Sequence, residues 1–154
     1  MGFAVEIPGR GALELDHLVL DVNGTLTGRG ELLEGVAGRL TKLRDSLEVS
    51  LLSADTFGTL AATADGLGAH ATLVESGEAK RRVVDELGAE RCVAIGNGAN
   101  DALMLEAAAL GIAVVGPEGA AGAALRAADL VCASVLDALD LLLDERALVA
   151  TLRA

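Results

Sequence analysis

Short apolar segments alternate with helical segments along most of this sequence. Apolar residues dominate the predicted strands, which cover residues 17–21, 49–53, 70–75, 91–95, 111–115 and 130–132. Between and after them we predict helices over residues 36–46, 56–67, 76–87, 100–110, 118–127 and 135–152, the last as one or two helices. This alternation is typical of an α/β fold with a doubly wound parallel sheet covered on both faces. A chain of 154 residues can bury one sizeable core, so we expect a single domain over residues 1–154.

Two segments depart from this alternation. Residues 3–7 and 12–15 are short extended pieces joined by Pro8-Gly9-Arg10-Gly11, which predicts a small N-terminal hairpin. Residues 25–34 are rich in glycine and polar residues, and we expect an irregular loop or small flap there.

The first strand of the sheet delivers an aspartate to a sharp turn. In Leu18-Val19-Leu20-Asp21-Val22-Asn23-Gly24-Thr25-Leu26-Thr27, Asp21 ends the apolar run and Asn-Gly turns the chain. Parallel α/β sheets present reactive groups at this edge. Taken alone, the pattern fits a plain turn equally well, because Asn-Gly is a very common turn dipeptide.

The composition excludes some classes of partner. A net charge of −11 argues against a nucleic acid or an anionic membrane, since either would need a basic surface. Cys92 and Cys132 lie in apolar runs without a partner motif, so we interpret them as small buried side chains. No secretory leader or membrane-length apolar stretch is apparent, and we expect a cytoplasmic protein.

Polar residues at later strand ends favour phosphate chemistry. Ser53 ends the second predicted strand, Lys80 lies near the start of a helix, and Gly96-Asn97-Gly98-Ala99-Asn100-Asp101 follows another strand. A carboxylate can attack phosphorus, while a hydroxyl and an ammonium stabilise the phosphoryl oxygens. A glycine-rich loop that bears Asn and Asp can hold Mg²⁺. Together with Asp21, these groups predict phosphoryl transfer.

These segments resemble, in the same order, the four motifs of the haloacid dehalogenase (HAD) superfamily. Asp21-x-Asn-Gly-Thr-Leu-Thr, Ser53-Ala-Asp55, Lys80 and the loop of residues 96–101 look most like the P-type ATPase branch. The resemblance implies a Rossmann-like core, dependence on Mg²⁺ and an aspartyl-phosphate intermediate.

The resemblance also implies a role for each site residue. Asp21 would be the nucleophile, assisted by Lys80 and by Asn23 as a positioning group. The implied substrate-binding residues are Ser53, Ala54, Lys80 and Asn100. The implied metal-binding residues are Asp21, Asn23 through its main-chain carbonyl, Asn97 and Asp101.

Two positions depart from the pattern of the superfamily. Phosphatases of the superfamily usually carry a general acid and base where this chain has Asn23, which cannot exchange a proton near neutral pH. Asn97 stands where a metal-binding aspartate is usual, which removes a second negative charge. We therefore expect a slow phosphomonoester hydrolase.

The motifs also lie too close together for a substrate-covering cap domain. Neither the interval from Asp21 to Ser53 nor that from Ser53 to Lys80 has room for one. An open site suits a large phosphorylated substrate, or a second copy of the chain that covers it. Two alternatives remain: a non-catalytic or regulatory phosphate-binding module, and a subunit active only with a partner.

Overall fold

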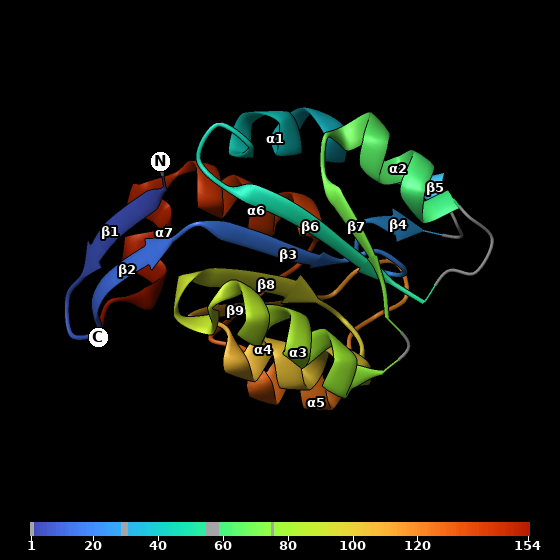
Figure 1. Cartoon of the computed structure of the whole chain (residues 1–154). Helices are drawn as coiled ribbons and strands as arrows, with labels where there is room; N and C mark the ends of the chain where they lie inside the picture. Colours follow the sequence, from blue (N-terminus) through green and yellow to red (C-terminus); the bar gives the residue numbers. More distant parts are fainter. Residues whose placement is uncertain (1, 29–30, 55–58, 75) are drawn as a thin grey trace.

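A six-stranded parallel sheet forms the centre of the protein. The computed structural model describes residues 2–28, 31–54, 59–74 and 76–154. The sheet has the order β10-β9-β8-β3-β6-β7 (Figure 1), and each neighbouring pair is parallel. Its strands are β3 (His17–Asp21), β6 (Glu48–Ser53), β7 (His70–Leu73), β8 (Cys92–Gly96), β9 (Leu110–Val114) and β10 (Leu130–Cys132). This sheet confirms the predicted α/β, Rossmann-like, doubly wound fold.

The strand order reverses beside β3. The chain first adds β6 and β7 on one side of β3, and then returns to place β8, β9 and β10 on the other. In sheets of this kind, ligands bind where the order reverses, outside the carboxyl ends of the strands. Asp21, the last residue of β3, therefore lies at the switch point.

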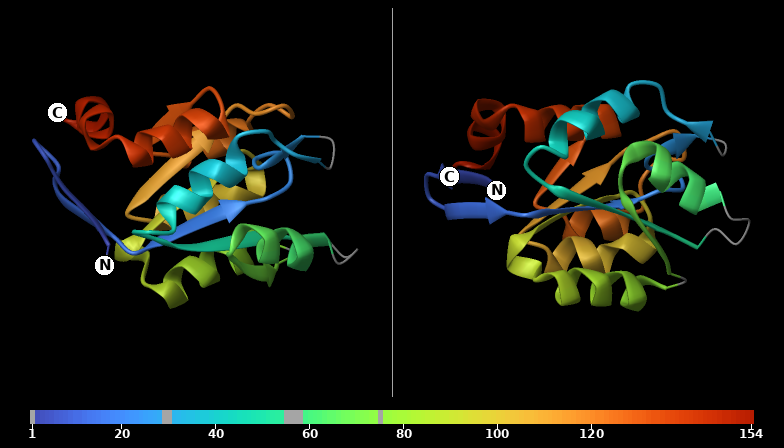
Figure 2. Two further views of the ribbon diagram at one scale, coloured as in Figure 1. Left: turned by 90° about the horizontal axis from the view of Figure 1, so that it is seen from above. Right: turned by 45° about the horizontal axis from the view of Figure 1, so that its top comes forward.

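Helices cover both faces of the sheet. On one face lie α1 (Val36–Leu43), α2 (Thr59–Leu67) and α6 (Val135–Leu143), and on the other α3 (Gly77–Leu87), α4 (Ala102–Ala107) and α5 (Gly122–Ala127) (Figures 1 and 2). The first core contains large aliphatic side chains such as Leu20 and Leu51, whereas alanines such as Ala94 and Ala113 line much of the second. The second face is therefore covered by helices that approach the sheet closely.

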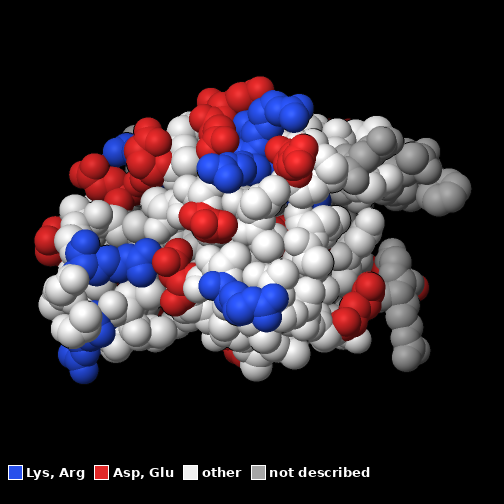
Figure 3. All heavy atoms as spheres, turned by 90° about the horizontal axis from the view of Figure 1, so that it is seen from below, with Lys and Arg blue, Asp and Glu red and all other residues white. Residues whose placement is uncertain are grey.

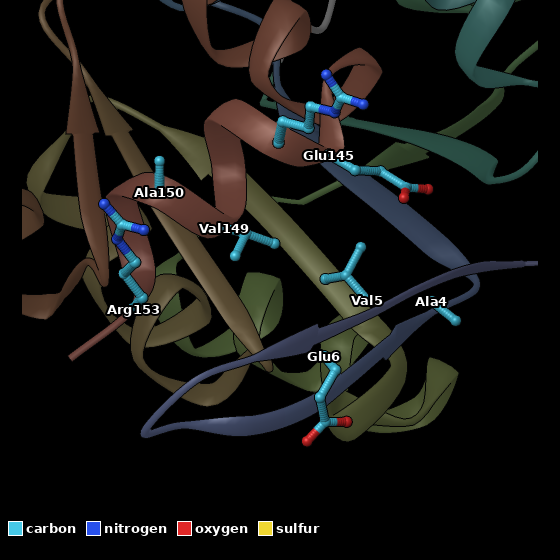
Figure 4. Close-up of a pocket in the computed structure, with 8 residues that line it drawn as sticks. Ala4, Val5, Glu6, Glu145, Val149, Ala150 and Arg153 are labelled. Atoms are coloured by element: carbon cyan, nitrogen blue, oxygen red, sulfur yellow. The ribbon is translucent and has the colours of Figure 1, made fainter.

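The N-terminal hairpin and the flap lie at opposite ends of β3. As predicted, β1 (Phe3–Ile7) and β2 (Gly11–Leu15) pair antiparallel, and α7 (Glu145–Leu152) packs against β1. A hollow of about 470 Å³ lies beside this contact of β1 and α7 (Figure 4). Val5 and Val149 line it together with charged side chains such as Glu6 and Arg153. At the other end of β3, β4 (Thr27–Gly28) and β5 (Glu31–Leu32) form the predicted flap.

Several helix boundaries differ from the prediction. The helix expected over residues 118–127 begins only at Gly122, because Gly119 has a positive φ of 76° and its N–H binds the carbonyl of Gly116 in a turn. The helix expected over 100–110 is replaced by a short 3-10 turn, η2 (Ala99–Asp101), and α4; a second such turn, η1 (Ala89–Arg91), precedes β8. The C-terminal segment forms two helices, because Asp144 caps α7. Residues 55–58 lie outside the described residues, so the predicted start of α2 and the position of Asp55 stay untested.

The described chain has no room for a cap between its motifs. Between β3 and β6 the structure describes only the flap and α1, and between β6 and α3 only α2 and β7. This agrees with the predicted absence of a cap domain from these two intervals.

Charged side chains of both signs are interspersed on the surface seen from below. Lys and Arg side chains alternate there with Asp and Glu and form no continuous basic area among the residues shown (Figure 3). In the part of the chain that the structure describes, every helix is too short or too polar to cross a bilayer.

We predict that neither cysteine reacts with a thiol reagent in the folded protein. Cys92 and Cys132 are both buried, and burial, with nearby carboxylates, raises the pKa of each thiol to about 11. The thiolate is the reactive form, so little of it exists near pH 8. Labelling with an aryl disulfide should modify no thiol before unfolding and two in guanidinium chloride. Rapid labelling of either thiol in the native protein would contradict the buried placement.

Candidate active site

The alternation of side chains along β3 determines where Asp21 points. Leu18 and Leu20 enter the core beneath α1 and α6, while Val19 enters the core beneath α3 and α4. Asp21 has the parity of Val19, so its carboxylate is directed toward the face of α3 and α4. It is only 5% exposed. A buried carboxylate needs partners, and three other segments provide them.

The turn after β3 returns a hydroxyl to this carboxylate. The N–H groups of Thr25, Leu26 and Thr27 all bind the carbonyl oxygen of Val22, at 3.2, 2.9 and 3.2 Å. Gly24 has a φ of 78°, which favours glycine. The tight turn places the Thr25 Oγ1 3.0 Å from Asp21 Oδ2.

Lys80 is the ionic partner of Asp21. Ser76 caps α3 by accepting the N–H of Ala79, and Lys80 follows in the first turns of the helix. Its Nζ lies 2.8 Å from Asp21 Oδ1 and 2.7 Å from Asp101 Oδ1, and the side chain is almost wholly buried. Removal of one member of such a buried group leaves the other charges without a partner, which destabilises the fold.

Asp101 ties Lys80 to the glycine-rich loop. Its Oδ2 accepts the N–H groups of Asn97 at 3.0 Å and Gly98 at 2.9 Å, while its Oδ1 accepts Lys80. The approach requires glycine at position 96, since a Cβ there would lie 2.5 Å from the Cγ of Asp101. Both oxygens of Asp101 are thus occupied, so in this arrangement it orients the loop and the lysine.

The Asn97 side chain is fixed by a contact at each end. Its Nδ2 donates to the carbonyl of Gly119 at 3.0 Å, which identifies the other terminal atom as the oxygen. That Oδ1 lies 3.1 Å from Thr25 Oγ1 and therefore faces Asp21. A side chain at Gly24 would disturb this arrangement, because its Cβ would lie 3.0 Å from Asn97 Nδ2.

The remaining predicted residues differ in burial, since Ser53 is buried whereas Asn23 is exposed. Asn23 Nδ2 donates to Ser53 Oγ at 3.2 Å, so these two predicted residues do meet. Ala54 and Asn100 are both exposed. Within the described residues, no hydrogen bond links either of them to Asp21 or Lys80, and their predicted role in binding substrate stays a prediction.

Charges and burial shift the pKa values of the central pair. Burial raises the pKa of Asp21 from 3.8 to about 6, and the charge of Asp101 adds to this, while Lys80 and Thr25 oppose it. For Lys80, burial works to lower the pKa, but the attraction of Asp21 and Asp101 outweighs it and the pKa is raised.

The oxygen donors at this edge fit a hard divalent cation. Asp21 Oδ2 and Asn97 Oδ1 both lie within hydrogen-bond distance of one hydroxyl, so a single cation can reach both. Carboxylate and amide oxygens are ligands that Mg²⁺ accepts. Among the described residues, however, no group of three or more His, Cys, Asp or Glu side chains could hold a metal ion. The asparagines at 23 and 97 explain this shortage of charged ligands.

Thr25 is the site residue to which the sequence analysis assigned no role. It is completely buried and contacts both Asp21 and Asn97. A threonine in the tight turn four residues after the aspartate is the signal that could have identified it, because such a turn folds its side chain back onto the strand end.

Other proteins are similar to this chain in sequence or in fold. An uncharacterized protein of Methanocaldococcus jannaschii is 47% identical over 79 residues, which cover 49% of this chain and 85% of that protein. No family model matches the chain. A structure from Streptomyces avermitilis, described as a HAD family hydrolase, is 25% identical with a TM-score of 0.65, over 77% of this chain and 76% of that chain. The chain has the fold of the HAD-family hydrolases.

Two further structures with a similar fold differ from each other in their described activity. A zinc-transporting P-type ATPase is 26% identical with a TM-score of 0.66, over 78% of this chain but 20% of that much longer one. The 3-deoxy-D-manno-octulosonate 8-phosphate phosphatase of Moraxella catarrhalis, in complex with magnesium and phosphate ions, has a TM-score of 0.65 and 18% identity, over 90% of this chain and 94% of that chain. The second likeness shows a shared fold.

We predict that replacing Asp21 by Asn makes the metal-free protein relatively more stable as the pH rises. The pKa of Asp21 is about 6 when folded and near 3.8 when unfolded, so the stability that its proton contributes is lost as the pH rises through about 6. Between about pH 4.5 and pH 7.5, the free energy of unfolding of Asp21→Asn should gain on the order of 1 to 2 kcal/mol relative to wild type. Urea unfolding in EDTA measures this.

The control for this prediction is Asp45→Asn, at an exposed aspartate. Its free energy of unfolding should follow that of the wild type at both pH values. The same pH dependence in Asp21→Asn and in wild type would contradict the raised pKa of Asp21.

Proposed function

We propose that this protein is a divalent-metal-dependent phosphatase that uses Mg²⁺ and forms an aspartyl-phosphate intermediate on Asp21. The observation that supports this most is the buried contact of Lys80 with Asp21 and Asp101 at the switch point of the sheet. A carboxylate that only stabilised the fold would gain nothing from this position. Phosphatases with the same fold, such as that of Moraxella catarrhalis, support the same class of reaction.

The reaction would proceed in two displacements at phosphorus. In the first, an oxygen of Asp21 attacks and the bond to the leaving group breaks, which leaves phosphate covalently attached to Asp21. In the second, water attacks the phosphorus, the bond to Asp21 breaks, and inorganic phosphate is released. Lys80 balances the negative charge that gathers on the phosphoryl oxygens in both steps.

Three groups would hold the cation: the carboxylate of Asp21, the main-chain carbonyl of Asn23 and the side-chain oxygen of Asn97. When bound, the metal supplies positive charge against the phosphoryl oxygens. Asp101 would assist from behind, because it fixes the loop that carries Asn97. A set with one carboxylate in direct contact should bind Mg²⁺ weakly.

Asn23 would limit the rate. Its amide donates to Ser53, so the side chain is fixed near the site but has no proton to give near neutral pH. Leaving groups that need protonation would depart slowly, and the attacking water would lack a base. We therefore expect better turnover of aryl phosphates, whose phenolate leaves unaided, than of alkyl phosphates.

We predict Mg²⁺-dependent hydrolysis of p-nitrophenyl phosphate that Asp21→Asn abolishes. The amide cannot attack phosphorus, so the loss should exceed about 10³-fold. The assay compares wild type, Asp21→Asn and the exposed control Asp45→Asn, each with Mg²⁺ and with EDTA.

Activity in Asp21→Asn equal to that of the wild type would overturn the proposed nucleophile. If wild type and variant are both inactive while inorganic phosphate still binds, the alternative of a regulatory phosphate-binding module replaces the phosphatase. The two asparagines at positions 23 and 97 are the observation that favours this alternative.

We also predict that Asn23→Asp raises turnover of the same ester by up to about 10²-fold, because it restores a general acid and base. The matched control is Asn23→Ala, which removes the amide without adding a carboxylate and should not accelerate the reaction. Mg²⁺ affinity, measured by calorimetry, verifies that the metal site survives. An unchanged rate in Asn23→Asp with intact Mg²⁺ binding would refute this explanation of slow turnover.

A further inference from the structure

Thr25 links two groups that lie far apart in the sequence. Its side chain is completely buried, with Oγ1 3.0 Å from Asp21 Oδ2 and 3.1 Å from Asn97 Oδ1. Asp21 ends β3, whereas Asn97 follows β8 in the glycine-rich loop. One hydroxyl group therefore joins the proposed nucleophile to a proposed metal ligand.

Each of these two partners is fixed at its other end. Asp21 Oδ1 accepts Lys80 Nζ at 2.8 Å, and Asn97 Nδ2 donates to Gly119 at 3.0 Å. With Thr25 in place, both terminal atoms of each side chain lie within hydrogen-bond distance of a possible partner. Rotation of either group about its last side-chain bond would disturb the contacts at both of its ends.

The hydroxyl has one proton and two acceptors. A threonine O–H donates one hydrogen bond, so it satisfies Asp21 Oδ2 or Asn97 Oδ1 fully, but not both. Asn97 cannot donate to Asp21 in this orientation, because its oxygen lies on the side of Thr25 and its Nδ2 donates to Gly119. Were a cation held by Asn97 Oδ1, that oxygen would compete less for the hydroxyl proton, and Thr25 would be free to donate to Asp21.

The turn holds Thr25 in position independently of the site. The N–H groups of Thr25 and Leu26 bind the carbonyl of Val22. Thr27 lies in the same turn, is also buried, and directs its hydroxyl to the carbonyl of Val22 at 3.3 Å. The two threonines thus share a backbone environment, but the hydroxyl of Thr25 contacts Asp21, whereas that of Thr27 contacts the main chain.

We propose that Thr25 is a positioning residue that orients Asp21 and Asn97 together and thereby couples metal binding to the alignment of the nucleophile. The expected effect of Thr25 on kcat rests on the proposed function. The expected effect on Mg²⁺ affinity rests on the metal site alone. Thr25 does not touch the phosphorus. It acts through the orientation of the two side chains that do the binding and the attack.

The test is a pair of variants at position 25 with a control in the same turn. Thr25→Val keeps the shape and removes the hydroxyl, Thr25→Ser keeps the hydroxyl, and Thr27→Val removes a hydroxyl that the site does not use. Loss of a group that orients metal ligands typically costs about 10-fold to 100-fold in affinity or activity. We expect Thr25→Val to weaken Mg²⁺ binding by about 10-fold, and Thr25→Ser and Thr27→Val to stay within about 3-fold of wild type.

The kinetic measurement uses p-nitrophenyl phosphate at saturating Mg²⁺. Thr25→Val should lower kcat by about 10-fold or more with little change in KM, because alignment and not substrate binding is lost. Thr25→Ser should restore kcat. A purely structural role would instead lower kcat in Thr25→Val and Thr27→Val alike, in step with their thermal stability.

The two measurements separate failure of this inference from failure of the proposed function. Wild type that binds Mg²⁺ but hydrolyses nothing overturns the phosphatase, and weaker Mg²⁺ binding by Thr25→Val still supports the role of Thr25. Active wild type with Thr25→Val equal to Thr27→Val in Mg²⁺ affinity and kcat overturns the role of Thr25 alone. Should Thr25→Val not fold, Thr25→Ser and Thr25→Ala give the same comparison, since both lack the methyl group and only one keeps the hydroxyl.

Discussion

The buried ammonium of Lys80 is the interaction on which the rest of the site depends. It neutralises two carboxylates that come from separate parts of the sheet, Asp21 from β3 and Asp101 from the segment after β8. Burying any one of these charges alone would cost several kcal/mol. The two ion pairs therefore form only when β3, α3 and the glycine-rich loop are packed together. The arrangement of the charged groups thus depends on the assembly of this edge of the sheet.

The pairing of one lysine with two carboxylates also suggests a physical reason for the asparagines at positions 23 and 97. With aspartates at both positions, this edge would carry two more carboxylates in the metal-free protein, and Lys80 already contacts two. Each amide removes a like charge from the neighbourhood of Asp21, whose pKa burial and Asp101 already raise. Fewer like charges favour a stable edge in the absence of metal. Under the proposed function, the same two amides would lower metal affinity and leave no group for proton transfer, so stability and turnover would oppose each other at these positions.

The sequence predicted the sheet well because its strands are short apolar runs with clear turns, and the order of motifs placed Asp21, Ser53 and Lys80 at one edge. The sequence did not predict those helix boundaries and side-chain roles that depend on a single tertiary contact. The late start of α5 depends on the turn at Gly119, and the loss of the first turn of α4 depends on Asp101 binding two main-chain N–H groups. The role of Thr25 depends on a contact with Asn97, 72 positions away, which no local pattern encodes.

The buried charged groups and the exposed segments lie in different parts of the fold. The charged groups stand on the face where alanines let α3 and α4 pack closely, so their positions allow little change. The flap and the end of β7 lie on the open side, where Leu32 and Leu73 face solvent. Under the proposed function, contacts to the rest of a substrate would fall to these exposed segments, and the chemistry to the buried charges. Substitutions in the flap would then change which substrate is bound without moving a charge, so related chains could differ in specificity while they keep one reaction.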